Sequence, residues 1–256
     1  HTLNNSAVFT SVYNPTVKNG RLGGTGSYRV EEGKTLTLDQ ITLGADVEVQ
    51  TGGHLSVSSG LLILDQAAVH LEGYRNQWTS ERGATVAFLD FVGAAPLLTG
   101  NGEVLFEGNW LGNWVRALDD HSVLTIDSGI AIHGPHGGSV GTDDMNRTVN
   151  VINRGRITAE GDYTVTVQAA NVRNEGVMEA QANHSLYVYN LTNAATGTVK
   201  LGNADSRLLL GNLTTLEGDT TIAGDGLLLV NDTLDLQGHT LNNSAVFTSV
   251  YNPTVK

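Results

Sequence analysis

Hydrophobic and polar positions alternate along short segments of this chain, and the segments recur at a nearly constant spacing. Asparagines mark the recurrence, at nearly equal steps along the chain: Asn153, Asn174, Asn193, Asn212 and Asn231. The residues two and four positions before each of these asparagines are apolar or aromatic. Because side chains alternate between the two sides of a strand, each segment is predicted to be a short strand with one side buried.

A strand that returns about every twenty positions, with no helix-length amphipathic stretch between returns, is typical of a β-solenoid. Each coil would contain two or three strands, and each strand would pair with its counterpart about 4.8 Å away in the next coil. We therefore predict an all-β chain folded as a right-handed parallel β-helix. A β-sandwich would also show short strands and glycine-rich turns, but it would not predict the regular recurrence.

The recurring asparagines have two interpretations. Equivalent side chains could hydrogen-bond to one another along the stack as a ladder. Alternatively, the asparagines could lie in turns, because Asn tolerates the left-handed backbone conformation. Both interpretations agree with a solenoid.

The first half of the chain follows the pattern less strictly. Residues 28–71 alternate in short segments with glycines between them. Residues 72–120 break the pattern and contain all three tryptophans, Trp78, Trp110 and Trp114. We predict that this region forms longer loops or an irregular flap, and insertions in repeat proteins often map to the binding side.

The two ends of the chain have the same sequence. Residues 1–18, HTLNNSAVFTSVYNPTVK, recur without change as residues 239–256, and we call this sequence the terminal segment. The simplest interpretation is a tandem array in which residues 1–238 form one unit and residues 239–256 begin the next. One unit would contain about twelve coils and rise on the order of 55–60 Å. An engineered duplication that closes or caps the solenoid is the alternative.

Composition narrows the partners. The 256 residues are 40% hydrophobic, which is enough apolar surface for a sizeable core. The formal net charge is −12 with only 14 Lys and Arg, which disfavours nucleic acid and anionic membranes because phosphate binding needs clustered basic residues. The absence of cysteine excludes disulfides, thiolate metal sites and thiol catalysis. No apolar run is long enough to span a bilayer.

Three segments carry a family resemblance. VINRGRITAEG (151–161) and VRNEGVMEAQA (172–182) resemble the coils of filamentous-haemagglutinin-type and autotransporter-passenger β-helices, and LTNAATGTVKLG (191–202) is similar with two extra residues. The resemblance covers residues 122–250 well and 28–71 loosely. It implies a right-handed parallel β-helix, secretion to the bacterial cell surface, and an adhesive or scaffolding role. The long identical repeat departs from the family and indicates a giant fibrous protein whose partners are neighbouring identical units, with surface glycans as a second class of partner.

The most polar stretch is HGPHGGSVGTDD (133–144). Four of its side chains could coordinate a divalent cation, although a solvated glycine-rich loop explains the same composition: His133, His136, Asp143 and Asp144. Together with Asp119 and Asp120, the carboxylates could also act as acid and base in a β-helix polysaccharide lyase or hydrolase. An acidic protein would repel a polyanionic glycan, so we expect neither an enzyme nor a cofactor.

GNWLGNW (108–114) places Trp110 and Trp114 four positions apart, each next to an asparagine. Such a pair could stack on a sugar ring if exposed, but large aromatic side chains are mostly buried, so packing beneath the flap is the alternative. The sequence thus predicts a structural repeat of a long extracellular filament or adhesin. A polysaccharide-cleaving enzyme and a carbohydrate-binding adhesin module are the alternatives.

Overall fold

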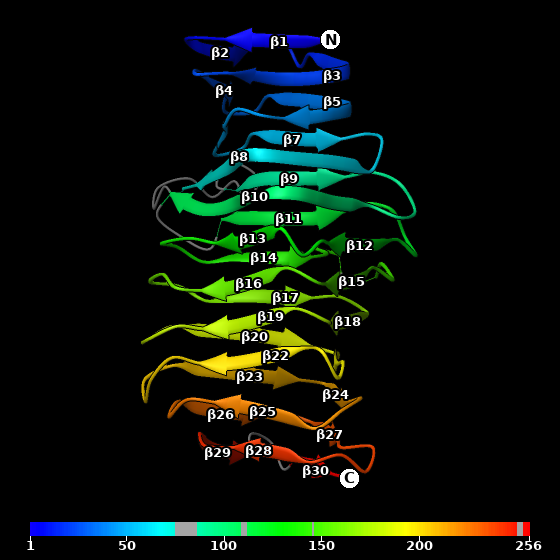
Figure 1. Ribbon diagram of the computed structural model, residues 1–256, viewed down its shortest axis with the longest axis vertical. Helices are drawn as coiled ribbons and strands as arrows, with labels where there is room; N and C mark the ends of the chain where they lie inside the picture. The colour runs from blue at the N-terminus through cyan, green and yellow to red at the C-terminus, as the bar shows by residue number, and fades with distance from the viewer. Residues whose placement is uncertain (75–85, 109–111, 145, 250–252) are drawn as a thin grey trace.

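The chain folds into a rod of stacked coils with its two termini at opposite tips (Figure 1). The computed structural model describes residues 1–74, 86–108, 112–144, 146–249 and 253–256. The described chain has thirty strands and no helix, and its strands pair in parallel, each with the strand one coil away. The prediction of a parallel β-helix is confirmed.

The strands form three stacks along the rod, which we name faces A, B and C in the order in which the chain visits them. Face A contains β1 (Thr2–Asn5), the ends of β3 (Thr16–Gly24) and β5 (Thr35–Leu43), the beginnings of β8 (Leu61–Gly73) and β10 (Leu97–Gly108), β12 (Val123–Ile126), β15 (Asn150–Asn153), β18 (Asn171–Asn174), β21 (Leu191–Asn193), β24 (Leu213–Leu216), β27 (Thr233–Asp235) and β30 (Thr254–Val255).

Faces B and C are built in the same way. Face B contains β2 (Val8–Ser11), β4 (Ser27–Val30), β6 (Val47–Gln50), the ends of β8 and β10, β13 (Ile130–His133), β16 (Arg156–Ala159), β19 (Val177–Ala180), β22 (Thr198–Leu201), β25 (Thr220–Ala223) and β28 (Leu241–Asn243). Face C contains the beginnings of β3 and β5, β7 (His54–Val57), β9 (Ala87–Phe91), β11 (Asn113–Ala117), β14 (Gly138–Gly141), β17 (Val165–Gln168), β20 (Ser185–Tyr189), β23 (Arg207–Gly211), β26 (Leu227–Val230) and β29 (Val246–Ser249).

Four long strands cross a corner of the rod without interruption. In β3, β5 and β8 a single residue in the left-handed region bends the strand: Asn19 (φ 54°), Gln40 (φ 56°) and Gln66 (φ 55°). In β10 the bend is at Gly100 (φ 99°), where an added Cβ would lie 2.0 Å from the Leu64 carbonyl oxygen of the neighbouring coil. Glycine and asparagine tolerate positive φ, which suits Gly100 and Asn19 to these corners, whereas Gln40 and Gln66 have no such intrinsic preference.

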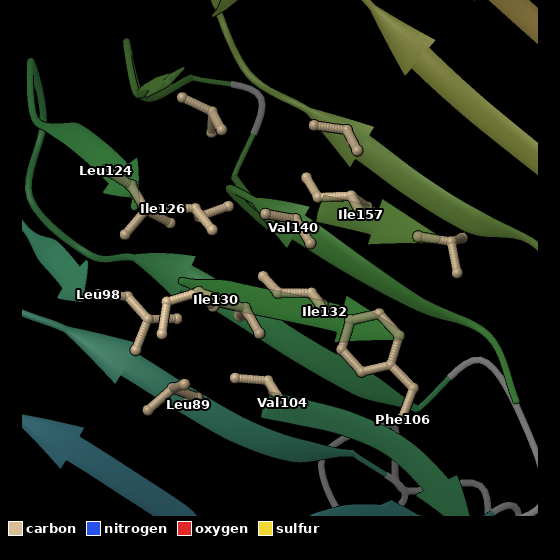
Figure 2. Close-up of a cluster of buried hydrophobic side chains, with 14 of the residues drawn as sticks. Leu89, Leu98, Val104, Phe106, Leu124, Ile126, Ile130, Ile132, Val140 and Ile157 are labelled. Carbon is tan, nitrogen blue, oxygen red and sulfur yellow. The ribbon is translucent and has the colours of Figure 1, made fainter. Parts of the chain in front are cut away.

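The core is a column of aliphatic side chains from alternate residues of every strand. Figure 2 shows a section of it, in which residues of all three faces meet and are fully buried: Leu98, Val104, Ile132, Val140 and Ile157. Each layer is only about 4.8 Å thick, so side chains the size of Val, Leu and Ile fill it well, which explains the low aromatic content.

The prediction of twelve coils per unit is too high. Ten coils separate Phe9 from Asn243 when the inward residue of face B is followed from coil to coil, through Phe9, Tyr28, Val47, Val69, Val104, Ile132, Ile157, Met178, Val199, Ile222 and Asn243. Coils in the middle of the chain are longer than the sequence pattern predicts: Leu64 stacks on Gly100, Leu98 on Ile126 and Ile126 on Asn153. The rise per unit is therefore about 50 Å.

Residues 72–120, where the sequence predicts a flap, contribute β9, β10 and β11 to the stack. Two parts of this region, 75–85 and 109–111, lie outside the described residues, and Trp78 and Trp110 are in them.

Candidate functional site

A buried asparagine ladder runs along the corner between faces A and B. The Nδ2 of Asn153 donates to the Oδ1 of Asn174 at 2.9 Å, and the Nδ2 of Asn174 donates to the Oδ1 of Asn193 at 2.9 Å. The Nδ2 of Asn193 continues the ladder to the Thr220 hydroxyl at 3.1 Å. Each amide also donates to a backbone carbonyl, and the three asparagines are at most 1% exposed. The ladder begins at Asn153, whose Oδ1 has no partner because its neighbour in the preceding coil is Ile126.

Asn212 and Asn231 lie outside this ladder. The coil that follows Asn193 is longer than the one before it, so Asn193 stacks on Leu216 rather than on Asn212. Asn212 instead has φ 57° at the corner between faces C and A, as Asn190 does with φ 53°. Asn231 follows Val230 at the end of β26. The regular step between asparagines in the sequence therefore equals one coil as far as Asn193 but not beyond.

Trp114 lies on the outer side of face C and is partly buried, next to Phe88 in the preceding coil and Ser139 in the following one. The His54 ring stacks on Phe88, with ring centroids 4.4 Å apart and planes 10° apart. An outward file of His54, Phe88 and Trp114 thus follows the axis of the rod over three coils. Trp110, the other tryptophan of the predicted pair, is outside the described residues.

A buried ion-pair cluster lies beside this aromatic file. Asp90 is 3% exposed, and its carboxylate accepts from the Arg116 Nε at 2.6 Å and lies 2.7 Å from the His54 Nδ1. Burial raises the pKa of Asp90, but the hydrogen bonds from His54 and Arg116 outweigh it and hold the pKa below its ordinary value. Arg116 also pairs with Asp143 and lies 3.9 Å from the Phe88 ring centroid. The cluster joins neighbouring coils of face C, and the sequence pattern did not indicate it.

The predicted metal ligands are engaged elsewhere. His133 on face B lies 2.6 Å from Glu160 through its Nδ1, and the His136 ring packs near Tyr163. Asp143 pairs with Arg116, and Asp144 accepts hydrogen bonds from Asn146. Among the described residues, no group of three or more His, Asp and Glu side chains is arranged to hold a metal ion.

Two of the carboxylates considered for acid–base chemistry, Asp119 and Asp120, accept backbone hydrogen bonds from neighbouring coils. Asp119 accepts from the Gly93 backbone at 2.6 Å, and Asp120 accepts from the Thr148 backbone at 2.7 Å. Backbone hydrogen bonds, from Thr148 to Asp120 and from Asn146 to Asp144, lower the pKa of these two carboxyls. A general acid needs the opposite shift, so these groups are poorly suited to protonate a leaving group.

A carboxyl with a raised pKa, that of Glu72, lies at a different place, in a shallow cavity of about 380 Å³ at the edge between faces B and C. Burial raises the pKa of Glu72, and the nearby charges of Glu48 and Glu107 raise it further. Glu32 and Tyr74 also line the cavity. Glu32, Glu72 and Glu107 are far apart in the sequence and meet only through coil stacking, so the sequence pattern could not indicate the cavity.

The two copies of the terminal segment form the coils at the two tips of the rod. Leu3 stacks on Leu22 and Phe9 on Tyr28, and the partners Leu22 and Tyr28 are each 1% exposed. Leu3 and Phe9 point to the same core but are 48% and 40% exposed, because no coil covers them. At the other tip, Phe247 stacks on the fully buried Leu228 and is 44% exposed. Both tips therefore present an open end of the hydrophobic core and an unpaired strand edge.

No helix in the described chain is long and apolar enough to cross a lipid bilayer. Comparison of the chain with protein-family models, with curated proteins and with solved structures finds no match.

Proposed function

We propose that this chain is a structural repeat of a long extracellular filament or adhesin, and that the filament forms by uninterrupted stacking of coils from one repeat to the next. The observation that carries the proposal is the pair of identical coils. The first copy stacks on residues 21–39 and the second on residues 219–236, from opposite sides. Together they give one coil with a neighbour on each side, as every interior coil has.

The exposed apolar surface supports the same proposal. Most of the large exposed hydrophobic side chains of the described chain lie in the two copies: Leu3, Val8, Phe9, Val12 and Tyr13 in the first, and Val246, Phe247 and Val255 in the second. Solenoid ends that face water usually carry a polar capping repeat. A further coil would cover the inward-facing Leu3, Phe9 and Phe247, and burying such a side chain contributes roughly 1.5–3 kcal/mol. It would also pair the free strand edges, which otherwise promote aggregation.

A secreted bacterial surface protein is the setting that fits this architecture. The coil motifs at residues 151–161 and 172–182 resemble filamentous-haemagglutinin-type passengers, which form extracellular β-helices. The neighbouring identical units are then the main partners of each unit. A catalytic role has little support, because hydrogen bonds lower the pKa of Asp120 and Asp144, and Asp143 is paired with Arg116.

Electron microscopy of a chain with three units in series tests the filament. We expect straight rods about 150 Å long, because each unit adds just over ten coils at about 4.8 Å. Three compact particles joined by flexible connections would contradict the proposal.

A glycan-binding adhesin module is the second candidate, and Trp114 on the outer side of face C favours it. Aromatic side chains present a large apolar face together with a polar edge, which suits stacking on a sugar ring. A glycan array with W110A and W114A variants tests it, with Y187A as the control because Tyr187 is another partly buried outward aromatic residue on face C. Loss of binding in the tryptophan variants alone is expected, and equal binding by all the proteins would end this candidate.

A further inference from the structure

The two copies of the terminal segment have the same local structure but lie on different faces of the rod. Leu3 in β1 stacks on Leu22 on face A, whereas its copy Leu241 in β28 stacks on Thr220 on face B. Figure 1 shows the two copies at opposite tips. The same segment thus begins on face A in the first copy and on face B in the second.

All three strands of the segment show the same displacement. Phe9 lies on face B, next to Tyr28, and its copy Phe247 lies on face C, next to Leu228. Val17 lies on face C, next to Leu38, and its copy Val255 lies on face A, next to Leu234. Three separate strand pairings therefore agree on a shift of one face in the same direction.

The shift does not come from a different fold of the segment. In the first copy the Asn5 Nδ2 donates to the Ala7 carbonyl at 2.6 Å, and the Ala7 N donates back to the Asn5 Oδ1 at 3.1 Å. In the second copy the Asn243 side chain and Ala245 make the same two bonds, at 3.0 and 3.1 Å. The corner of the segment is formed by this turn in both places.

The coil count gives the size of the shift. Ten coils separate Phe9 from Asn243 on face B, and the counterpart of Asn243 in the first copy is Asn5, which precedes Phe9 by one face. One unit, residues 1–238, is therefore ten coils and one face, or ten and a third coils.

Glycine pairs explain how one turn can stack at two different corners. At the first tip the Asn5 turn lies on Gly24-Thr25-Gly26, where an added Cβ on Gly26 would meet the Ala7 carbonyl oxygen at 1.9 Å. At the second tip the Asn243 turn lies on Gly224-Asp225-Gly226, and the Gly226 carbonyl accepts from Val246 N at 2.8 Å. A Gly-x-Gly corner therefore faces the turn on whichever face the copy occupies.

We propose that successive units of the filament are related by a rotation of one third of a turn, and that residues 239–256 form the junction coil. This inference rests on the proposed filament. The junction coil lies between residues 219–236 of its own unit and the counterpart of residues 21–39 in the next unit. The faces realign only after three units. A surface feature confined to one face, such as the His54–Phe88–Trp114 file, then points in three directions along the fibre, so that the fibre can contact a ligand surface whichever way it lies.

Disulfide mapping tests the face of the junction coil in the full chain, which contains no cysteine of its own. Thr221 and Asn242 are exposed and directly opposite each other on face B, at a spacing that a disulfide can bridge. If a unit were instead a whole number of ten coils, Asn242 would replace Asp235 as the neighbour of Thr215 on face A. The variants are T221C/N242C and T215C/N242C, and S139C/T166C is the control pair in the interior of face C.

After mild oxidation we expect an intramolecular disulfide in most of the T221C/N242C protein and in the control, and only background bonding in T215C/N242C. A disulfide in T215C/N242C but not in T221C/N242C would overturn the rotation of one third of a turn between units and leave the filament proposal standing. Equal bonding in both pairs would overturn a fixed rotation as well. Bonding in the control alone would show that the copy does not continue the solenoid, which would overturn both the rotation and the filament.

Discussion

The side-chain Nδ2 of Asn174 donates to the Oδ1 of Asn193 at 2.9 Å in the interior of the rod, and the Asn174 Oδ1 accepts from Asn153 on the other side. The middle residue of this ladder, Asn174, therefore hydrogen-bonds to two buried asparagines at once. Replacing it with an apolar side chain of similar size removes the acceptor of one Asn153 N–H and the donor to the Asn193 Oδ1. A buried polar group left unsatisfied in this way costs about 1–3 kcal/mol.

We predict that Asn174→Leu lowers the free energy of unfolding by about 2–4 kcal/mol, measured by urea denaturation. The same two strands offer a matched control, because the Asn171 side chain donates to Asn150 at 2.8 Å on the exposed surface. Asn171→Leu should change stability by less than about 0.5 kcal/mol. Equal losses in the two variants would show that burial of the ladder is not what stabilises it.

Asp90 should make stability depend on pH. Its pKa is lowered in the folded protein, so its contribution is present above the ordinary pKa of an aspartate and is lost as the pH falls through the lowered value. We predict that Asp90→Asn destabilises the protein at pH 7 by about 1–3 kcal/mol, because Arg116 and His54 lose a buried charged partner. The difference from the parent protein should shrink in urea denaturation at about pH 3. A difference that stays constant with pH would contradict the assigned ionisation.

The ionisation of Glu72 should affect the stability of the fold in the opposite direction to that of Asp90. Its pKa is raised, so its ionised form destabilises the folded protein above the raised pKa, and the penalty disappears as the pH falls through it. Glu72→Gln should therefore stabilise the protein at pH 7, by a few tenths of a kcal/mol because the site is partly solvated. Glu175→Gln is the control of opposite sign, since hydrogen bonds from Arg173 and Arg154 lower the pKa of Glu175. Destabilisation by Glu72→Gln would show that its carboxylate is paired rather than repelled.

The open tips predict that alanine substitution of two stacked leucines, Leu22 and Leu3, lowers stability by different amounts. Leu22→Ala should cost about 2–5 kcal/mol, because Leu22 is buried between two coils. Leu3→Ala, one coil nearer the tip, should cost less than about 1 kcal/mol, because Leu3 is half exposed. In a two-unit chain the leucine at position 241 is covered by the next unit, so Leu241→Ala should become as costly as Leu22→Ala. An unchanged small cost there would contradict stacking across the junction.

The fold could be predicted from the sequence because every strand of a solenoid has the same local alternation of buried and exposed positions. The inward positions of β15, β18 and β21 could be read directly from the apolar residues before Asn153, Asn174 and Asn193. The number of coils could not be predicted, because strands one coil apart still pair when the coil is longer than the sequence pattern predicts, as Leu64 and Gly100 do.

The polar clusters were not predictable for a related reason. Asp90 meets His54 and Arg116 only through the register of neighbouring coils, across separations of 36 and 26 residues. Neither separation matches the period of the pattern. The polar stretch at residues 133–144 was conspicuous in the sequence, but His133 lies on face B whereas Asp143 pairs with Arg116 of face C.

The distance between spin labels at Thr10 and Lys200 tests coil stacking most directly. Both residues point outward on face B next to Phe9 and Val199, which are eight coils apart. With T10C and K200C labelled, double electron–electron resonance should give one narrow distribution centred at about 38 Å, since each coil adds about 4.8 Å. A distribution centred below about 25 Å, or one too broad to define a single rod, would contradict a continuous parallel solenoid.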